Sequence, residues 1–200
     1  MSKLQEPQQP PLPKEDALPL LEPHFNDFWS IALSVWNAWE NIPEDGRMMI
    51  SPTARANVLF SYIVHYARSL FADVDGATIY DKQLFLVGIG DALLRWKKLK
   101  SHKDLRSRNY PTLFQQQYTK QRRLPGIPRS TRLTVGYVLD VTGTFIEALY
   151  ITCPLGNRIA WYIEIPRPRA IKVLPLPTPQ TMPPAVRAVN VRRKEQKDTK

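Results

Sequence analysis

The sequence predicts an α+β protein in which a bundle of three to four helices precedes a three-stranded antiparallel β-meander. Apolar residues repeat at helical spacing in long segments before residue 100, and alternation with period two begins after residue 131. Two turn signals divide that later stretch into three runs. The predicted divisions are a disordered Pro- and Gln-rich tail (1–22), a helical bundle (23–126), a β-meander packed on the bundle in the same domain (127–166) and a Pro-rich basic arm (167–200).

The ends of the chain differ from its middle in proline content. Six of the 19 prolines precede residue 24 and seven follow residue 165, which favours extended or disordered ends. No apolar run approaches the ~18 residues that a membrane-spanning helix needs, and the N-terminus lacks an apolar signal sequence. Cys153 is the only cysteine, so no internal disulfide can form. We therefore expect an intracellular (cytoplasmic) protein that makes no membrane contact.

Three helices are predicted before residue 101, and a short fourth follows. Apolar positions over residues 25–41 recur every three or four residues and include three tryptophans, which favours a core-packed stripe over a partner surface. Ser51-Pro52 is an N-cap followed by proline, so a helix is expected to run from there to about residue 73. The spacing of Phe85, Ile89 and Trp96 predicts a third helix over residues 81–100, and a short one is expected to end near residue 121.

The meander follows from two turns. Thr142-Gly143 predicts a tight hairpin that pairs Val141 with Thr144, and Pro154 to Asn157 predicts a second turn that pairs Cys153 with Arg158. Because side chains alternate along a strand, these pairings collect one apolar face. That predicted face comprises Leu133, Val135, Tyr137, Leu139, Ile146, Ala148, Tyr150, Ile159, Trp161, Ile163 and Ile165.

The same pairings place Glu147 directly opposite Glu164. Like charges facing each other across strands are unfavourable, so a cation or a shared proton is expected beside them. A basic side chain such as Arg132 or Arg158 is the simpler expectation. A metal ion with Asp140 as a third ligand is the alternative, although two carboxylates alone are a weak metal signal. We predict no metal site, no cofactor and no catalytic residue.

The net charge of +10 is unevenly distributed along the sequence. Residues 1–94 hold 6 basic and 12 acidic side chains, whereas residues 95–140 hold 12 basic side chains against two acidic ones. Such segregation produces a positive field that attracts polyanions or an acidic partner. The stretch also interleaves aromatic with basic residues, as surfaces that stack bases and pair with phosphates do. The predicted nucleic-acid contacts are Arg95, Lys97, Lys98, Lys100, Lys103, Arg106, Arg108, Tyr110, Tyr118, Lys120, Arg122 and Arg123.

The favoured function is therefore a non-enzymatic protein that binds DNA or RNA through phosphate contacts. One alternative is a protein-interaction subunit whose basic face meets an acidic protein. The other is a small nuclease that uses a divalent ion held by Glu147 and Glu164, or an arginine and a histidine. Arg95 and His102, with six residues between them, resemble the catalytic pattern of HEPN-type ribonucleases, which are helical bundles. The resemblance covers eight residues, and Trp96 stands where that family usually has a polar residue. The oligomeric state is left open.

Overall fold

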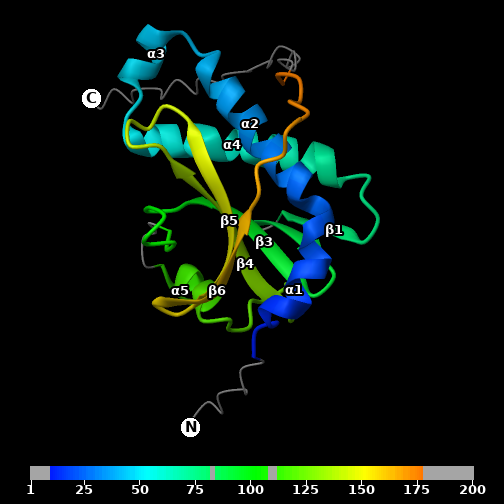
Figure 1. Ribbon diagram of the computed structural model, residues 1–200. Coiled ribbons are helices and arrows are strands. Elements are labelled where there is room, and N and C mark those ends of the chain that lie inside the picture. Colours follow the sequence, from blue (N-terminus) through cyan, green and yellow to red (C-terminus); the bar gives the residue numbers. More distant parts are fainter. Residues whose placement is uncertain (1–9, 82–83, 108–111, 178–200) are drawn as a thin grey trace, which may run out of the picture.

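The computed structural model describes residues 10–81, 84–107 and 112–177. These residues form a six-stranded mixed sheet in the strand order β1-β2-β3-β4-β5-β6, with helices packed against it (Figure 1). The α+β class predicted from the sequence is confirmed. The prediction of a three-stranded meander is wrong, because three further strands extend the sheet beyond it.

The helices divide between the two faces of the sheet. Figure 1 shows α1 and α2 on one side and α5 on the other. Ser51 caps α4 as predicted, since its Oγ accepts a hydrogen bond from the backbone N–H of Ala54. The described helices are α1 (Lys14–Leu21), the 3₁₀ turn η1 (Glu22–His24), α2 (Phe25–Glu40), α3 (Glu44–Met49), α4 (Pro52–Phe71) and α5 (Leu113–Thr119). The predicted helices over residues 25–41 and from Ser51 to about residue 73 are confirmed as α2 and α4.

Helix α1 lies within the segment predicted to be a disordered tail. Its residues Ala17 and Leu21 are fully buried in the core, so this prediction is wrong for residues 14–21. The helix was missed because Pro19 stands inside it and its apolar stripe is short. Residues 1–9 of the predicted tail lie outside the described residues.

The third predicted helix, over residues 81–100, is also wrong, because the chain forms strands there. The described strands are β1 (Ala77–Asp81), β2 (Phe85–Ile89), β3 (Ala92–Lys98), β4 (Thr131–Leu139), β5 (Ile146–Leu155) and β6 (Arg158–Ile165). Short apolar runs buried on both faces satisfy helical spacing as well as strand spacing. Two features favour strands here. Gly88 and Gly90 would destabilise a helix, and Gly90 adopts a left-handed φ of 49° in the turn between β2 and β3.

Strands β3 and β4 pair in parallel, and every other adjacent pair in this sheet is antiparallel. A parallel pair needs a crossover that returns the chain to the same end of the sheet. Residues 99–130 make that crossover, and α5 lies within it. The basic stretch of the sequence therefore becomes a segment laid across one face of the sheet rather than part of a helical bundle.

The predicted strand register is correct only next to the first turn. Leu139 pairs with Ile146 as expected, but a bulge between Val138 and Leu139 shifts the pairs beyond it by one residue. Strand β5 continues through Pro154, so Cys153 pairs with Trp161 and not with Arg158. Two side chains of the predicted single face, Ala148 and Tyr150, consequently lie on the opposite side of the sheet, in a separate cluster that Ile159 also joins.

Different helices cover the two faces of the sheet. On one face the main core joins α1, α2 and α4 to the strands, with Phe28, Trp29 and Trp96 almost fully buried. On the other face Tyr118 of α5 packs with Leu86 and Leu124. In the described part of the chain, no helix is both long and apolar enough to span a membrane.

The segment after β6 packs back against α2. The backbone N–H of Leu174 donates a hydrogen bond to Ser34 Oγ at 2.7 Å, and the Arg167 guanidinium lies 5.3 Å from the ring centre of Trp29. The first part of the predicted basic arm over residues 167–200 is thus anchored on the core. Residues 178–200 of that arm lie outside the described residues.

Candidate nucleic-acid interface

The crossover begins with a short segment, residues 99–107, that we call the crossover arm. Leu99 and Leu105 are buried in a cluster with Ala148 and Tyr150 of β5, which fixes the arm on the face opposite α2 and α4. The Leu99 backbone N–H donates to the carbonyl of Tyr137 at 2.9 Å. Gly136 leaves the room for this contact, because a Cβ there would collide with the Leu99 side chain.

The arm carries three cations, and two of them bind one carboxylate. Arg106 donates to both oxygens of Asp104 at 2.7 Å, and the Lys100 ammonium donates to Asp104 at 3.0 Å. The hydrogen bonds from Arg106 and Lys100 hold the pKa of the Asp104 carboxyl well below its usual range. Lys103 is exposed on the same arm. The carboxylate offsets a single charge, so the arm keeps an excess of positive charge at neutral pH.

The turn between β5 and β6 connects the arm to α5. Arg106 Nη1 donates to the carbonyl of Asn157 at 3.4 Å, and the N–H of Gly156 donates to the carbonyl of Thr119 at 2.8 Å. Arg106 therefore contacts this turn, Lys120 follows the residue that is hydrogen-bonded to it, and Arg158 begins the strand after it. We define the basic surface as the exposed side chains of Lys100, Lys103, Arg106, Lys120, Arg122, Arg123 and Arg158.

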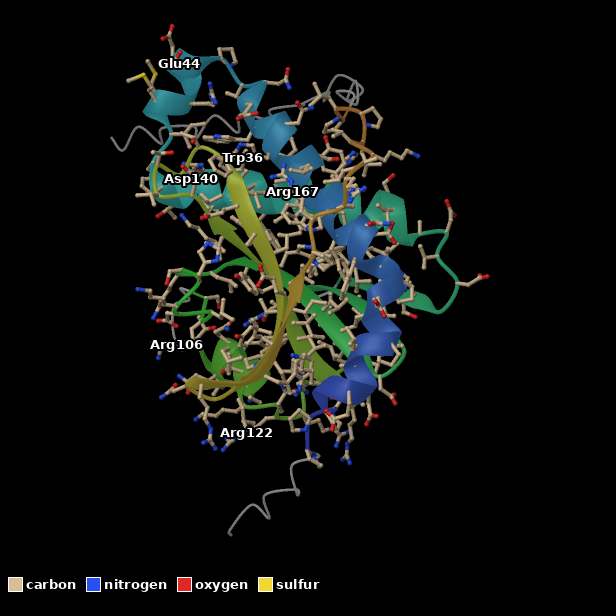
Figure 2. All side chains as sticks on the ribbon, in the orientation of Figure 1. Trp36, Glu44, Arg106, Arg122, Asp140 and Arg167 are labelled. Carbon is tan, nitrogen blue, oxygen red and sulfur yellow. The ribbon has the colours of Figure 1, made fainter. Side chains whose placement is uncertain are left out.

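Figure 2 shows Arg106 and Arg122 extending outward on the side of the molecule that carries α5, away from Glu44 of α3. Many of the acidic side chains lie on other elements. Glu15 and Asp16 belong to the first turn of α1, and Glu44 and Asp45 to that of α3. Glu44 of α3 therefore lies at the opposite end of the molecule from Arg122.

Two of the predicted nucleic-acid contacts are buried instead. Arg95 is 4% exposed and its guanidinium lies 3.9 Å from the ring centre of Tyr118, which is completely buried. Arg95 also donates to Gln115 of α5 at 2.6 Å and to Thr134 of β4 at 3.3 Å. Desolvation lowers the pKa of Arg95. These two side chains hold α5 on the sheet, and neither is available at the surface.

The remaining predicted contacts lie in different surroundings. The Lys97 ammonium lies 5.9 Å from the ring centre of Phe60 of α4, and desolvation lowers its pKa. Lys98 is exposed at the end of β3. Arg108 and Tyr110 lie outside the described residues. From the predicted set, the structure therefore exposes Lys100, Lys103, Arg106, Lys120, Arg122 and Arg123 on two segments that are both hydrogen-bonded to the β5–β6 turn, and Arg158 follows that turn.

The carboxylate pair predicted from the sequence does not form. Glu164 pairs with Tyr150, whereas Glu147 Oε2 lies 2.9 Å from His102 Nε2 of the arm. The predicted opposition was wrong because Arg158 pairs with Leu155 rather than with Cys153, and the irregularity between Cys153 and Pro154 shifts the β5–β6 register by one further residue. Asp140, the third proposed ligand, is hydrogen-bonded within the β4–β5 hairpin. Among the described residues, no three His, Cys, Asp or Glu side chains gather as metal ligands would.

The helical setting implied by the HEPN resemblance is wrong as well. Arg95 lies on strand β3 and is buried, whereas His102 lies on the crossover arm. The two side chains have different partners: the Tyr118 ring for Arg95, and the Tyr150 hydroxyl, 2.8 Å from Nδ1, for His102. His102 thus links the arm to β5 through Tyr150 and Glu147.

Aromatic and acidic side chains lie beside the basic surface, and sequence reasoning did not assign them to it. Tyr162 of β6 is 51% exposed, and its ring centre lies 6.2 Å from that of Tyr150 in an edge-to-face contact. Sequence reasoning missed them because it did not predict the pairing of Tyr150 with Glu164. That pairing places Tyr150, Tyr162 and Glu164 on the face of the sheet that the arm covers. Comparisons with protein-family models, with curated proteins and with solved structures found no match to this chain.

Proposed function

We propose that this chain is a non-enzymatic nucleic-acid-binding protein whose basic surface contacts phosphates. One observation carries the proposal: exposed cations lie on three segments, the crossover arm, the segment after α5 and the start of β6, that are joined at one turn. The Arg106–Asn157 and Thr119–Gly156 hydrogen bonds tie these three segments together. A polyanion crossing this turn would meet all three segments at once.

The mechanism of binding is neutralisation of charge. Each phosphate paired with a Lys or Arg side chain releases condensed counterions, so the affinity falls as salt rises. Contacts of this kind position a nucleic acid without reading its sequence. The basic surface is built from long, exposed, charged side chains, which suits phosphates better than base edges.

The experiment compares two single substitutions, each of which removes one exposed arginine. Arg122→Gln changes the basic surface, whereas Arg68→Gln changes α4, where Arg68 pairs with Asp81. With a single-stranded oligonucleotide as probe, Arg122→Gln should reduce the salt slope by about 0.7 and weaken binding roughly eightfold at 50 mM salt. Arg68→Gln should change neither quantity. Equal effects of the two substitutions would refute this location for the binding surface.

An acidic protein partner is the alternative that the same charges allow. Poly-glutamate distinguishes nucleic-acid binding from binding of an acidic protein, because it offers carboxylates in place of phosphates at a similar charge density. The proposal expects a single-stranded oligonucleotide to bind more tightly than poly-glutamate of equal charge. Tighter binding of poly-glutamate would favour the interaction subunit.

A further inference from the structure

Tyr162 is an aromatic side chain left half exposed beside the basic surface. Its ring is 51% exposed, although its neighbour Tyr150 is only 5% exposed. The edge-to-face contact with Tyr150 supports one part of the ring, and the Lys14 ammonium lies 5.9 Å from its centre. A rigid, supported aromatic face that reaches solvent is what a nucleic-acid base stacks upon.

The support beneath Tyr162 is itself fixed. The Tyr150 hydroxyl lies 2.8 Å from His102 Nδ1, and the other imidazole nitrogen lies 2.9 Å from Glu147. Burial, together with the charge of Glu164, raises the pKa of Tyr150, so its phenol stays neutral at physiological pH. Burial and the contact with His102 hold the Tyr150 ring in one orientation. The ring against which Tyr162 packs is therefore already fixed in the unbound protein.

Glu164 provides an acceptor beside this platform. It is exposed two residues after Tyr162 on the same face of β6, directly opposite Tyr150 in the register. A carboxylate repels phosphate, so this position disfavours the nucleic-acid backbone. It suits the donor edge of a base, and guanine offers two such donors, N1–H and the exocyclic amine, to one carboxylate.

We infer that Tyr162 and Glu164 form a subsite for one unpaired base, with guanine preferred, at the margin of the basic surface. The inference rests on the proposed function, and it narrows the ligand class to single-stranded nucleic acid. In a duplex both faces of a base are stacked and its pairing edge is occupied. Only an unpaired base can present a face to Tyr162 and an edge to Glu164 together.

The arm lies where the phosphates of such a strand would run. Leu105 of the arm packs in the same cluster as Tyr150, and the next residue is Arg106 of the basic surface. A strand with one base on Tyr162 therefore meets cations as it continues toward the β5–β6 turn. Stacking and phosphate contacts then come from different side chains and can be removed separately.

The test measures binding of the full chain to a 12-nucleotide single strand and to a duplex of equal total charge. Tyr162→Ala should weaken binding to the single strand at least fivefold, since stacking contributes about 1–3 kcal/mol per base. Its salt slope should stay unchanged, and Tyr162→Phe should retain the wild-type affinity. Phe145→Ala is the matched control, because Phe145 is 48% exposed at the distant β4–β5 hairpin and should have no effect.

A second arm of the experiment tests the role of Glu164. The probe for this arm contains a single guanine. Replacing that guanine with hypoxanthine removes the exocyclic amine, which should weaken wild-type binding and leave Glu164→Ala binding unaffected. Wild-type affinity in Tyr162→Ala, or equal affinity for duplex and single strand, would overturn the subsite. If Arg122→Gln still weakened binding in that case, the proposed function would stand without the subsite. If the wild-type chain bound no oligonucleotide, both would fall.

Discussion

The guanidinium of Arg95 stacks on the ring of Tyr118 at 3.9 Å, and both side chains are buried between α5 and the sheet. The Tyr118 hydroxyl donates to the carbonyls of Leu93 in β3 and Leu133 in β4, at 3.1 and 2.6 Å. One side chain therefore connects α5 to both members of the parallel strand pair. This buried contact therefore positions α5 and, with it, the segment after α5 that carries part of the basic surface.

The first prediction concerns the Tyr118 hydroxyl. Tyr118→Phe keeps the ring under Arg95 but removes both hydrogen bonds, and it should lower the free energy of unfolding by about 1 kcal/mol. Urea denaturation followed by tryptophan fluorescence measures the change. Tyr162→Phe is the control, because it removes a hydroxyl from an exposed ring and should stay within about 0.5 kcal/mol of wild type. Equal stability of all three proteins would show that the hydroxyl contributes nothing.

The second prediction tests the packing of the crossover arm against Gly136 of β4. Gly136→Ala places a methyl group against Leu99 and should destabilise the protein by about 1–3 kcal/mol through overpacking. Leu99→Ala removes the colliding atoms but leaves a cavity of its own. The double variant should be destabilised by less than the sum of the two single-variant values, because the alanine at position 99 removes the atoms that the methyl group at position 136 would strike. Strict additivity would mean that the arm does not pack on Gly136.

Sequence reasoning recovered the elements whose signals are local. The Ser51-Pro52 cap and the tryptophan stripe of α2 gave the two long helices, and the Thr142-Gly143 turn gave one hairpin. It failed where tertiary context decides. The apolar residues of β2 and β3 fit a helix and a strand equally well, and their spacing does not distinguish the two.

The candidate site shows the same division. Charge counting located the basic region because charge is a property of composition, but it could not tell Arg95, which is buried, from Arg106, which is exposed. The β5–β6 register, with Leu155 opposite Arg158 and an irregularity between Cys153 and Pro154, changed which groups meet, so sequence reasoning did not find the pairing of Tyr150 with Glu164 or the Glu147–His102 contact. A bulge leaves no reliable mark in a single sequence.

The third prediction concerns Asp140 and pH. Burial acts to raise the pKa of Asp140, but the hydrogen bonds from the Thr142 hydroxyl and from the backbone N–H groups of Phe145, Thr142 and Thr144 outweigh it, so the pKa lies below its usual range. A depressed pKa stabilises the fold above the pKa of the unfolded chain, and this contribution is lost as the pH falls toward that of the folded state. Asp140→Asn should therefore lower the Tm at pH 7. The difference should shrink below about pH 4, where the unfolded carboxyl takes up its proton.

Thermal melts of wild type and Asp140→Asn at several pH values measure this effect. Asp104→Asn provides a comparison at a second carboxylate whose pKa is depressed, in that case by Arg106 and Lys100. A Tm difference between wild type and Asp140→Asn that stayed constant from pH 7 to pH 2 would contradict the assignment.

The fourth prediction concerns Cys153. The side chain is fully buried in β5, and burial raises the pKa of its thiol to about 12. Because the thiolate is the reactive form, the native protein should not react with a disulfide reagent between pH 7 and 9. The same protein in guanidinium chloride should react with one equivalent. Rapid reaction of the native chain at pH 8 would show that β5 opens or that the thiol reaches solvent.

The most direct test of the central claim is a salt titration of the full-length wild-type chain. A fluorescent 12-nucleotide single strand is titrated at increasing salt, starting from 50 mM, and the logarithm of the association constant is plotted against the logarithm of the salt concentration. Contacts to several phosphates predict a straight line with a slope of about −0.7 per phosphate neutralised. The absence of binding to DNA and to RNA at 50 mM salt, or an affinity that does not change with salt, would contradict a phosphate-binding basic surface.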